Sequence, residues 1–406
     1  MKILVANIGS TSLKWRLFEF SNGSERLLHK GGVERVKDYV EAIDACLAQL
    51  RDAGHIRSET DLAAIGFKTV MAQDVTGCVF LDEPVIRAME ACNEVAPAHN
   101  PPYIKGIRVF AKRMPGVPLA ALFETAFYQW MPEAATRYAI PEAWHKLGVR
   151  RWGFHGASHK FIAERSAELL GREDVADRAR HLYAQHTTDP VRGPALRVIS
   201  CHLGGSSSVT GILNGAAIGS SMGFSPQSGL PQNNRVGDLD PFALLFVRRA
   251  TGLTLEEIQA LLCQESGLKA LSGGDNDIRD IEAQARAGKP QAQLALAVLA
   301  HQTRHWIGSF LAQLNGADML AFTAGIGENS ADFREAVCAN LDHLGIALDP
   351  RLNASAKATE AIISAPQSPV KVAIIPTNEE LMVARETKRL LEQTSTQPLS
   401  SIKNVI

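Results

Sequence analysis

The sequence of 406 residues contains one pattern twice, nearly half a chain apart: an apolar run, a loop of glycine and serine, and a second run. The first copy covers residues 2–17 and the second covers residues 197–209. When the two copies are aligned, Gly9 falls on Gly204. Short apolar runs separated by such a loop are typical of paired strands. The pattern therefore predicts either two structurally related halves that each present one loop, or two unrelated hairpins.

The length of the chain and the order of its predicted elements also favour two domains. A single hydrophobic core rarely grows beyond roughly 250 to 300 residues. Amphipathic helices are predicted over residues 160–170, 290–314 and 332–344. Strands that alternate with such helices are typical of α/β architecture. The tail from Thr394 is polar and contains Pro398, and we expect it to be poorly ordered.

Composition and charge argue against several classes of partner. The chain has 42 basic and 43 acidic side chains and a formal net charge of −1, so no bulk field draws it toward nucleic acid or an anionic membrane. The first residues lack the features of a signal peptide, and no stretch approaches the ~20 apolar residues of a membrane span. We expect a cytoplasmic protein whose six scattered cysteines are reduced packing residues.

Three loops rich in small residues have the composition of phosphate-binding sites. Glycine allows the backbone to approach a ligand and serine adds a hydroxyl donor, as in segments 7–12 and 204–208. Taken singly, these two loops are also consistent with tight hairpins. The third segment, 324–329, follows a predicted strand over residues 319–323, and Ser330 can cap the next helix. Free amide groups at such a junction suit a nucleotide.

A polar segment near the C-terminus precedes an apolar helical run. Thr377 and Glu380 have the spacing of a capping box, in which each side chain bonds the backbone of the other residue. Glu379 lies between them. It is then free to bind a metal ion, or it is a solvated carboxylate at the helix end.

Two further segments place nitrogen donors where an anion could bind. His155 and His159 have a spacing that on a helix holds zinc, but the flanking glycines and the missing glutamate oppose that interpretation. A histidine that contacts an anion and an ordinary capping histidine both remain open. Arg235 lies in a segment punctuated by glycine and proline. Its planar guanidinium suits either a transferring phosphoryl group or a surface ion pair.

Together these segments resemble the acetate kinase family, in order and over nearly the whole chain. The segments that carry the resemblance are Asn7-Ile-Gly-Ser-Thr-Ser-Leu-Lys14, Ala96-Pro-Ala-His-Asn-Pro-Pro102, Phe123-Glu-Thr-Ala-Phe127, Arg151-Trp-Gly-Phe-His-Gly-Ala-Ser-His159, Cys201-His-Leu-Gly204, Gly237-Asp-Leu-Asp-Pro241, Phe322-Thr-Ala-Gly-Ile-Gly-Glu-Asn-Ser330 and Ile375-Pro-Thr-Asn-Glu-Glu-Leu381.

The resemblance implies an α/β fold of two duplicated actin-like (ribonuclease H-like) domains with a nucleotide cleft between them, and usually a homodimer. It implies an N-terminal domain of residues 1–125 plus 380–406 and a C-terminal nucleotide-binding domain of residues 126–379. The implied activity is transfer of a phosphoryl group between ATP and a short-chain carboxylic acid, with Mg²⁺ or Mn²⁺, to form an acyl phosphate and ADP.

The functional residues of the family map onto this sequence in four groups. The catalytic residues would be Glu124, His155 and Arg235. The acid would lie against Lys68, Val70, Ala98, Phe154 and Pro226. The metal would be held by Asn7 and Glu379. The nucleotide would contact Ser10, Ser12, Lys14, His202, Leu203, Gly204, Gly205, Ser206, Asp277, Ile278, Arg279, Gly325, Ile326, Gly327, Glu328 and Asn329.

The mechanism that the resemblance implies is direct in-line transfer. A carboxylate oxygen would attack the γ-phosphorus while Mg²⁺, arginine and histidine neutralise the spread charge. A carboxylate nucleophile needs no general base.

Several departures from the family pattern lie around the acid. Lys68 replaces an arginine that would fork onto the substrate carboxylate, and lysine offers only a point charge. Glu124 replaces the catalytic aspartate with a carboxylate that is one methylene longer. Tyr128 stands where a histidine is usual. We predict that Lys68 and Glu124 form one coupled unit.

Other departures concern the nucleotide loop and the apolar pocket. The loop ends His-Leu-Gly-Gly rather than His-Leu-Gly-Asn, with Gly205 in the last position, as in butyrate kinases of the same superfamily. Asn233 and Asn234 stand where Gly-Thr precedes the arginine. Ala98 replaces a leucine, which removes three carbons from the pocket wall. We therefore expect a longer or differently shaped acid to fit.

Two alternative functions follow from the same departures. The changes at Lys68, Glu124 and Gly205 are also consistent with a nucleotide-binding sensor or interaction protein that has lost phosphotransfer. The altered loop at Gly205 is consistent with a kinase that uses pyrophosphate as its donor.

Overall fold

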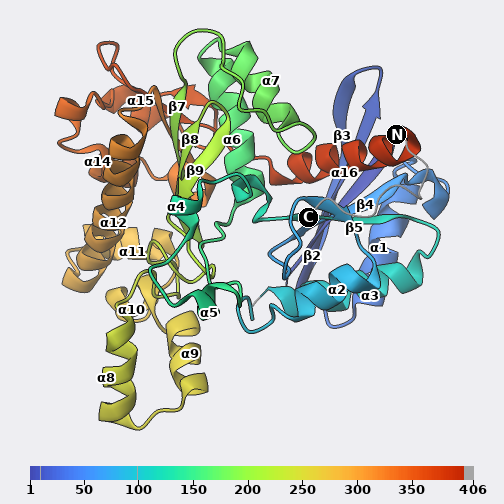
Figure 1. Cartoon of the computed structure of the whole chain (residues 1–406), viewed down its shortest axis with the longest axis horizontal. Helices are drawn as coiled ribbons and strands as arrows, with labels where there is room; N and C mark the ends of the chain where they lie inside the picture. Colours follow the sequence, from blue (N-terminus) through green and yellow to red (C-terminus); the bar gives the residue numbers. More distant parts are fainter. Residues whose placement is uncertain (10, 98, 397–406) are drawn as a thin grey trace.

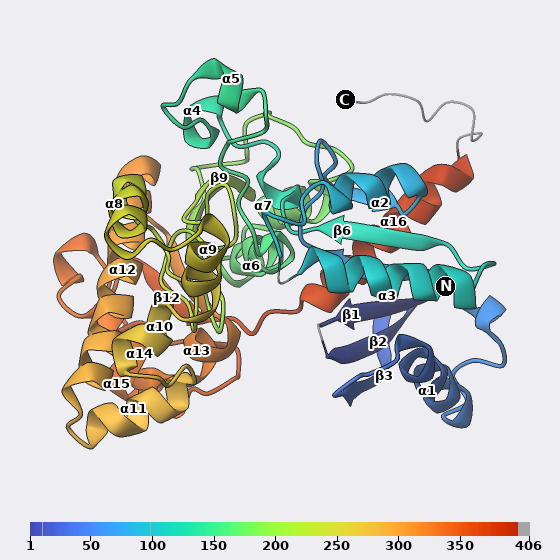
Figure 2. The same ribbon diagram turned by 90° about the horizontal axis from the view of Figure 1, so that it is seen from below.

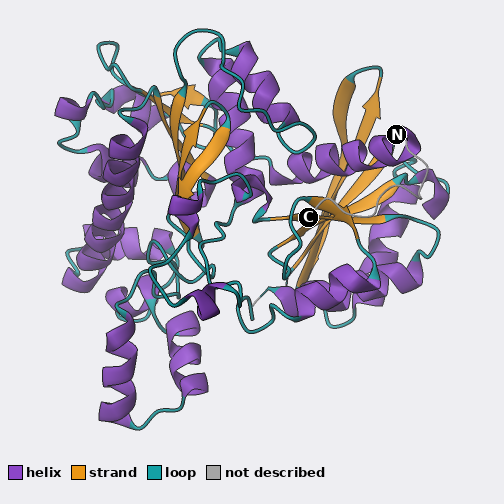
Figure 3. Cartoon of the chain, viewed as in Figure 1, coloured by secondary structure: helices purple, strands orange, loops and turns teal. Residues whose placement is uncertain are grey.

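The computed structural model describes residues 1–9, 11–97 and 99–396 (Figure 1). Strands gather in two separate sheets, and helices flank each of them (Figure 3). The α/β architecture of two similar domains is therefore confirmed.

The first sheet is formed by the N-terminal part of the chain. Its strands are β1 (Lys2–Ile8), β2 (Ser12–Ser21), β3 (Ser24–Glu34), β4 (Ala64–Thr69), β5 (Cys78–Phe80) and β6 (Leu119–Phe123). Their order is β3-β2-β1-β4-β6-β5. The strand β1 pairs antiparallel with β2 and parallel with β4. The strand β6 pairs parallel with β4 and antiparallel with β5.

The second sheet repeats this topology strand for strand. Its strands are β7 (Arg197–Leu203), β8 (Ser207–Leu213), β9 (Ala216–Ser220), β10 (Met319–Thr323), β11 (Ala361–Ile362) and β12 (Lys371–Ile374). Their order is β11-β12-β10-β7-β8-β9, with the same pattern of parallel and antiparallel pairs. Even the register shift recurs, between Leu17 and Phe18 on β2 and between Gly211 and Ile212 on β8. The two glycine and serine loops thus belong to related halves, not to unrelated hairpins.

Helices connect and cover the strands (Figure 2). In the N-terminal part they are α1 (Tyr39–Asp52), α2 (Glu83–Glu90), α3 (Asn100–Arg113), and the short 3₁₀ turns Glu59–Asp61 and Ala126–Tyr128. The others are α4 (Glu133–Thr136), α5 (Glu142–His145), α6 (Gly156–Leu169), α7 (Glu173–His181), α8 (Pro241–Thr251), α9 (Leu255–Gln264), α10 (Gly267–Ser272), α11 (Ile278–Arg286), α12 (Pro290–Leu314), α13 (Ala324–Asn329), α14 (Ala331–Cys338), the 3₁₀ turn Asp342–Leu344, α15 (Pro350–Ser355) and α16 (Glu379–Thr396).

The alternation of side chains along β1 explains how the first sheet is covered on both faces. Leu4, Ala6 and Ile8 point to the face on which α1 and α3 pack. Ile3 and Val5 point to the opposite face, where they meet the apolar stripe of α16. The last helix of the chain therefore completes the core of the first domain.

The second sheet is covered in the same way, by α12 on one face and α6 on the other. Ile199 and Cys201 of β7 pack with residues of α12, whereas Val198 packs with α6 and α7. Helix α6 also meets α16, because Ala157 and Leu381 belong to one buried cluster. We propose a division of the chain into residues 1–125 plus 380–406 and residues 126–379, supported by the packing of α16 on the first sheet; residues 397–406 lie outside the described part.

The predicted helices agree with the structure in part. Residues 290–314 are helical as predicted, and the helix predicted over 160–170 is α6, which begins earlier and ends before Gly171 at φ +68°. The prediction of a helix over residues 332–344 was wrong in its second half. Helix α14 ends at Cys338, and Asn340, two residues further on, adopts a φ of 57° that does not continue a helix.

The expectation for the C-terminal tail was wrong over its first residues. Helix α16 includes Thr394 and runs to Thr396. Pro398 lies outside the described residues. All six cysteines are free, as predicted. Within the described residues, no helix is both long and apolar enough to cross a membrane.

Gly156 gives a first prediction, about the contact between α6 and the end of β6. Its amide donates to the carbonyl oxygen of Glu124 at 3.0 Å, and an added Cβ would lie only 2.3 Å from that oxygen. The change Gly156→Ala should therefore push α6 away and lower the free energy of unfolding, measured in urea, by about 1–3 kcal/mol.

The matched control is Gly308→Ala, at an exposed position of α12 with open space around its Cβ. It should be neutral or stabilising by up to ~1 kcal/mol, because alanine is the better helix former. Equal effects of the two changes would contradict the prediction.

Candidate active site

Most of the residues predicted for catalysis, the acid and the metal line a single cavity of about 600 Å³. Residues of both halves contribute, because Asn7, Lys68 and His202 lie near the ends of β1, β4 and β7. The predicted residues that line the cavity are Asn7, Lys68, Val70, Glu124, Phe154, His155, His202, Gly204, Gly205, Ser206, Pro226, Arg235, Gly325 and Glu379.

A second cavity of about 560 Å³ adjoins the first. The two share Gly204, Gly205 and Gly325, so only backbone and small atoms separate them there. The second cavity is also lined by five of the predicted nucleotide residues, which are Asp277, Ile278, Arg279, Ile326 and Asn329. Most of the predicted nucleotide residues thus line one or the other of these two adjoining cavities.

Three charged side chains form the most buried cluster of the first cavity. The ammonium of Lys68 lies 2.8 Å from Oε2 of Glu379 and 3.1 Å from Oε1 of Glu124. The prediction that Lys68 and Glu124 act together is supported by this contact. Glu379 is therefore largely buried and not a solvated carboxylate, and while its Oε2 is paired with Lys68, its Oε1 has no hydrogen-bond partner.

The cluster also perturbs the protonation of its members. Burial acts to lower the pKa of Lys68, but the carboxylates of Glu379 and Glu124 outweigh it and raise that pKa well above its usual value. Burial raises the pKa of Glu124 despite the opposing effect of Lys68. For Glu379 burial also acts upward, yet Lys68 and His202 outweigh it and lower the pKa. Glu379 is thus the carboxylate that stays ionised most readily.

The residues present fit a hard divalent cation. Oε1 of Glu379 and Oε2 of Glu124 are buried and have no hydrogen-bond partner. Oδ1 of Asn7 lines the same cavity and accepts a hydrogen bond from the hydroxyl of Tyr103 at 2.8 Å. Oxygen atoms of this kind are the ligands that Mg²⁺ prefers, and they leave positions for phosphate and water. No cluster of three or more histidine, cysteine, aspartate or glutamate side chains that could hold a metal occurs in the described residues.

Two histidines are stacked beside the charged cluster. The rings of His155 and His202 lie 4.1 Å apart at an interplanar angle of 18°. His155 has a left-handed backbone, with φ 59°, and occupies the N-cap position of α6, although its side chain does not cap the helix. Burial, together with the neighbouring histidines, lowers the pKa of His155 well below its usual value. Burial, with a smaller effect of Lys68, lowers the pKa of His202 to about 4 against the opposing effect of Glu379. Both rings are therefore neutral at physiological pH.

Arg235 is held at the mouth of the cavity by the loop that contains it. Its guanidinium donates to the carbonyl oxygen of Pro226 at 3.2 Å. Gly267 packs against this loop so closely that an added Cβ would lie 2.1 Å from the carbonyl oxygen of Gln232. Among the described residues, Arg235 forms no ion pair with a carboxylate. Its charge is therefore available to an anion, and the alternative of a surface ion pair is not supported.

A model of the acetokinase family matches residues 30–385 of the chain. The chain belongs to this family. An acetate kinase of Geobacillus kaustophilus is 40% identical over 413 aligned residues, which cover 96% of this chain and 99% of that protein. Crystal structures of an acetate kinase from Porphyromonas gingivalis and a propionate kinase from Francisella tularensis each give a TM-score of 0.82, at 33% and 31% identity, and cover 96% of this chain and 99% of theirs. The protein is thus a phosphotransferase that has a carboxyl group as its acceptor.

Several residues predicted to bind the nucleotide do not line either cavity. Lys14 points away on β2, where it pairs with Glu34 at 3.1 Å and borders a different surface hollow. Leu203 is fully buried in the core of the second sheet. Ser12 lies behind Gly9, with its hydroxyl 2.5 Å from the site of an added Cβ. Ser10 and Ala98 lie outside the described residues.

Gly327 and Glu328 have a structural place instead. Gly327 is buried against Phe322. The carboxylate of Glu328 accepts hydrogen bonds from the amides of Ala324, at 2.8 Å, and Thr377, at 3.2 Å. It therefore fixes the start of α13 to the segment that leads into α16. The predicted capping box of Thr377 was wrong, because the side chain of Asn378 accepts from the amide of Leu381 at 3.3 Å.

Two polar residues that line the first cavity were missed by the analysis of the sequence. Tyr103 contacts Asn7, and His99 is largely buried beside Lys68 and Arg235. Burial and those two cations lower the pKa of His99 to about 4. Both residues lie in or next to the segment Ala96–Pro102 that carried part of the resemblance, and this position was the only signal.

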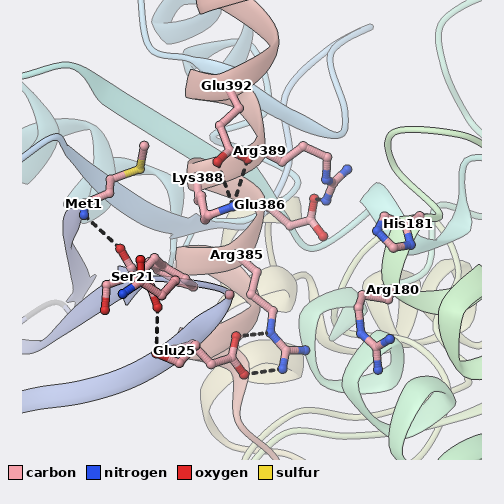
Figure 4. Close-up of a pocket in the computed structure, with 14 residues that line it drawn as sticks. Met1, Ser21, Glu25, Arg180, His181, Arg385, Glu386, Lys388, Arg389 and Glu392 are labelled. Carbon is pink, nitrogen blue, oxygen red and sulfur yellow. Dashed lines mark hydrogen bonds and ion pairs between the residues drawn. The ribbon is translucent and has the colours of Figure 1, made fainter.

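A third cavity, of about 480 Å³, lies where the turn between β2 and β3 meets α16 (Figure 4). Its arginine and lysine side chains are paired with glutamates: Arg180 with Glu164, Arg385 with Glu25, Lys388 with Glu392 and Arg389 with Glu386. No described residue predicted for the active site lines this cavity. Its charges are satisfied internally, and it does not compete with the glycine-lined cavities as the nucleotide site.

The charged cluster gives a second prediction. The change Lys68→Met leaves two carboxyl groups buried without a cation and should cost about 3–5 kcal/mol of unfolding free energy at neutral pH. The loss should be small near pH 4 and grow as the pH rises, because each carboxyl then has a folded-state pKa above its unfolded value and must be buried as an anion. Urea unfolding across this pH range measures it.

The matched control for that prediction is the double variant Lys68→Met with Glu124→Gln. It should recover a large part of the loss, since one buried carboxyl is removed, whereas Glu124→Gln alone should cost little. Strictly additive losses, or a loss independent of pH, would show that the three groups are not coupled.

Proposed function

We propose that the protein transfers the γ-phosphoryl group of ATP to a short-chain carboxylic acid and forms an acyl phosphate and ADP. The observation that carries the proposal is the pair of joined cavities, one with Lys68, His155 and Arg235 and the other with the predicted nucleoside contacts. A cavity of about 560 Å³ beyond the glycine loops favours a nucleoside triphosphate over pyrophosphate as the donor.

The reaction proceeds in line and needs no base. A carboxylate oxygen of the acid attacks the γ-phosphorus as the bond to the β–γ bridging oxygen breaks, and ADP leaves with that electron pair. Arg235 presents a planar, always charged donor to the equatorial oxygens. Because Arg235 has no carboxylate partner among the described residues, its full charge faces the phosphoryl group.

A chain of hydrogen bonds equips His155 to act as a neutral donor. Its Nδ1 lies 2.7 Å from the hydroxyl of Ser208, which lies 2.8 Å from Nε2 of His159. The Nδ1 of His159 in turn lies 2.8 Å from the hydroxyl of Ser200. If the hydroxyl of Ser200 donates to Nδ1 of His159, the proton of that ring lies on Nε2 and is donated to Ser208. The hydroxyl of Ser208 then donates to Nδ1 of His155, and the proton of His155 resides on Nε2. We propose this order, since only a protonated Nε2 can donate to the phosphoryl group.

Magnesium is the proposed metal. Asn7 and Glu379 would hold it, and when bound it supplies positive charge against the phosphate oxygens. The orphaned Oε1 of Glu379 supports this assignment. Glu124 holds the ammonium of Lys68, which would neutralise the carboxylate of the acid.

The acid end of the cavity is apolar. Val70, Phe154 and Pro226 line it, and Val70 and Phe154 belong to a buried cluster with Met222. A point charge at Lys68 does not impose the two-pronged orientation that an arginine would impose on the carboxylate. We propose an alkyl acid of short chain length, with room for an acid other than acetate.

A homodimer is supported by the helical hairpin of α8 and α9, which projects from the body of the molecule (Figure 1). None of the residues of α8 is buried, and Phe242 and Phe246 are 74% and 72% exposed. Leu245 and Leu255 extend this apolar surface. Exposed apolar patches of this kind mark interfaces between proteins. A cytoplasmic location remains a proposal, supported by the six unpaired cysteines.

The proposed reaction gives a third prediction. Incubation with ATP, Mg²⁺, hydroxylamine and a panel of acids from formate to butyrate, including hydroxy acids, should yield a hydroxamate from a short alkyl acid. The variant Arg235→Ala should lose about 10³-fold or more in kcat, because a guanidinium that stabilises a transferring phosphoryl group has an effect of this size. Absence of product from every acid, with ATP still bound, would overturn the proposed kinase.

The proposed dimer gives a fourth prediction. The change Phe242→Asp with Phe246→Asp should convert a dimer into a monomer in sedimentation velocity without lowering the melting temperature of the monomer, because neither side chain is buried within the chain. Leu294→Asp, at an exposed position of α12, is the matched control and should leave the dimer intact. A wild-type chain that sediments as a monomer would contradict the assignment.

A further inference from the structure

Asn233 is a polar side chain of the nucleotide cavity to which no role is assigned above. It lines the second cavity next to Gly205, at the junction with the first. Its Oδ1 is buried without a hydrogen-bond partner, and no hydrogen bond of the described residues involves its side chain. Oδ1 is an acceptor and cannot pair with a phosphate oxygen, whereas Nδ2, which lies next to Gly205, is a donor that no described residue engages and that an acceptor on a ligand at the junction can satisfy.

The backbone of Asn233 is fixed, which gives its side chain a defined position. Its amide donates to the carbonyl oxygen of Gly205 at 3.1 Å, and its own carbonyl oxygen accepts from the amide of Lys269 at 2.8 Å. The loop is thereby attached to the glycine loop on one side and to α10 on the other. Only the side-chain amide of Asn233 is free to respond to a ligand.

The side chain of Asn233 occupies the space that a side chain at position 205 would need. A Cβ added at Gly205 would lie 3.3 Å from Nδ2 of Asn233, a tighter approach than ordinary side-chain packing, and 3.7 Å from its Cγ. A side chain at either position therefore hinders one at the other. The sequence pattern that this chain resembles has asparagine at position 205 and glycine at position 233, and here the two residue types are exchanged. The exchange places one amide group in the same space from the opposite loop.

We infer that Asn233 is a nucleotide-binding residue whose side-chain amide donates a hydrogen bond to a phosphate oxygen of ATP at the junction of the two cavities. This inference rests on the proposed function for the identity of the ligand. An amide donor suits this position because Gly204, Gly205 and Gly325 offer no side-chain donor there. Arg235, two residues further along the same loop, reaches the first cavity. One loop thus holds the phosphate chain through Asn233 and the transferring group through Arg235.

The test compares two variants at Asn233 in the full-length protein. Asn233→Ala should raise the KM for ATP and the Kd for a fluorescent ATP analogue by about 10-fold or more, because a hydrogen bond to a charged group is lost. The KM for the acid should change less than 3-fold by comparison, since the acid lies in the first cavity. Asn233→Asp is nearly isosteric but has no donor and adds a negative charge, so it should weaken ATP binding more than alanine does. Retention of wild-type affinity by either variant would overturn the inference.

The exchange itself can be reversed. Gly205→Asn should impair ATP binding through crowding against Asn233, whereas the double variant Gly205→Asn with Asn233→Gly should recover to within about 3-fold of the wild type. A double variant no better than the worse single variant would overturn the inference. Circular dichroism melts of all variants separate a folding defect from a binding defect.

Direct measurement of ATP binding also keeps this inference distinct from the proposed function. If Asn233→Ala weakens ATP binding while no acid yields product, the inference stands and the kinase assignment fails. If product forms and Asn233→Ala binds ATP as the wild type does, the kinase assignment stands and the inference fails.

Discussion

The active site depends on one ammonium group held between two carboxylates. Lys68 lies in β4, Glu124 directly follows β6, and Glu379 is the first residue of α16, so the cluster connects three segments that are far apart in the sequence. Removing charges from water is costly, and the contacts of 2.8 and 3.1 Å offset that cost only while the ammonium of Lys68 is in place between the carboxylates. The position of α16, which completes the core of the first sheet, is therefore linked to the chemistry of the site.

The duplication of the fold provides a symmetric frame that the two halves use differently. The strands β1 and β7 occupy equivalent positions in their sheets, and each ends at the cavity. The first carries Asn7 next to its last residue, which offers an amide oxygen, whereas the second carries His202, a neutral ring stacked on His155. The two equivalent strands thus bring different groups to the cavity, an amide oxygen of the kind that suits a cation and a ring nitrogen of the kind that suits phosphate. The cavity joins the two kinds of group because equivalent strand ends face each other.

Much of this organisation could be predicted from the sequence. The internal repeat indicated related halves, and the segments shared with the acetate kinase family placed most of the site residues. Contacts made through tertiary structure could not be predicted in the same way. The pairing of Lys68 with Glu379 depends on how α16 returns to the first sheet. The sequence around either residue does not indicate that the other lies nearby. Lys14 was assigned to the nucleotide from a motif, yet the side chains of a strand alternate between its two sides, and that of Lys14 points away from the cavity toward Glu34.

The three glycines between the cavities are explained by different constraints. Gly205 is limited by the protein itself, because Nδ2 of Asn233 lies 3.3 Å from the position of an added Cβ, whereas at Gly204 an added Cβ would make only ordinary contacts, at 3.4 Å or more. Gly325 has no protein atom within 4 Å of an added Cβ and does not have a positive φ. Nothing in the described fold requires glycine there. A side chain at position 325 would instead enter the space that joins the two cavities, and glycine at this position is consistent with the proposal that a phosphate chain passes through that space.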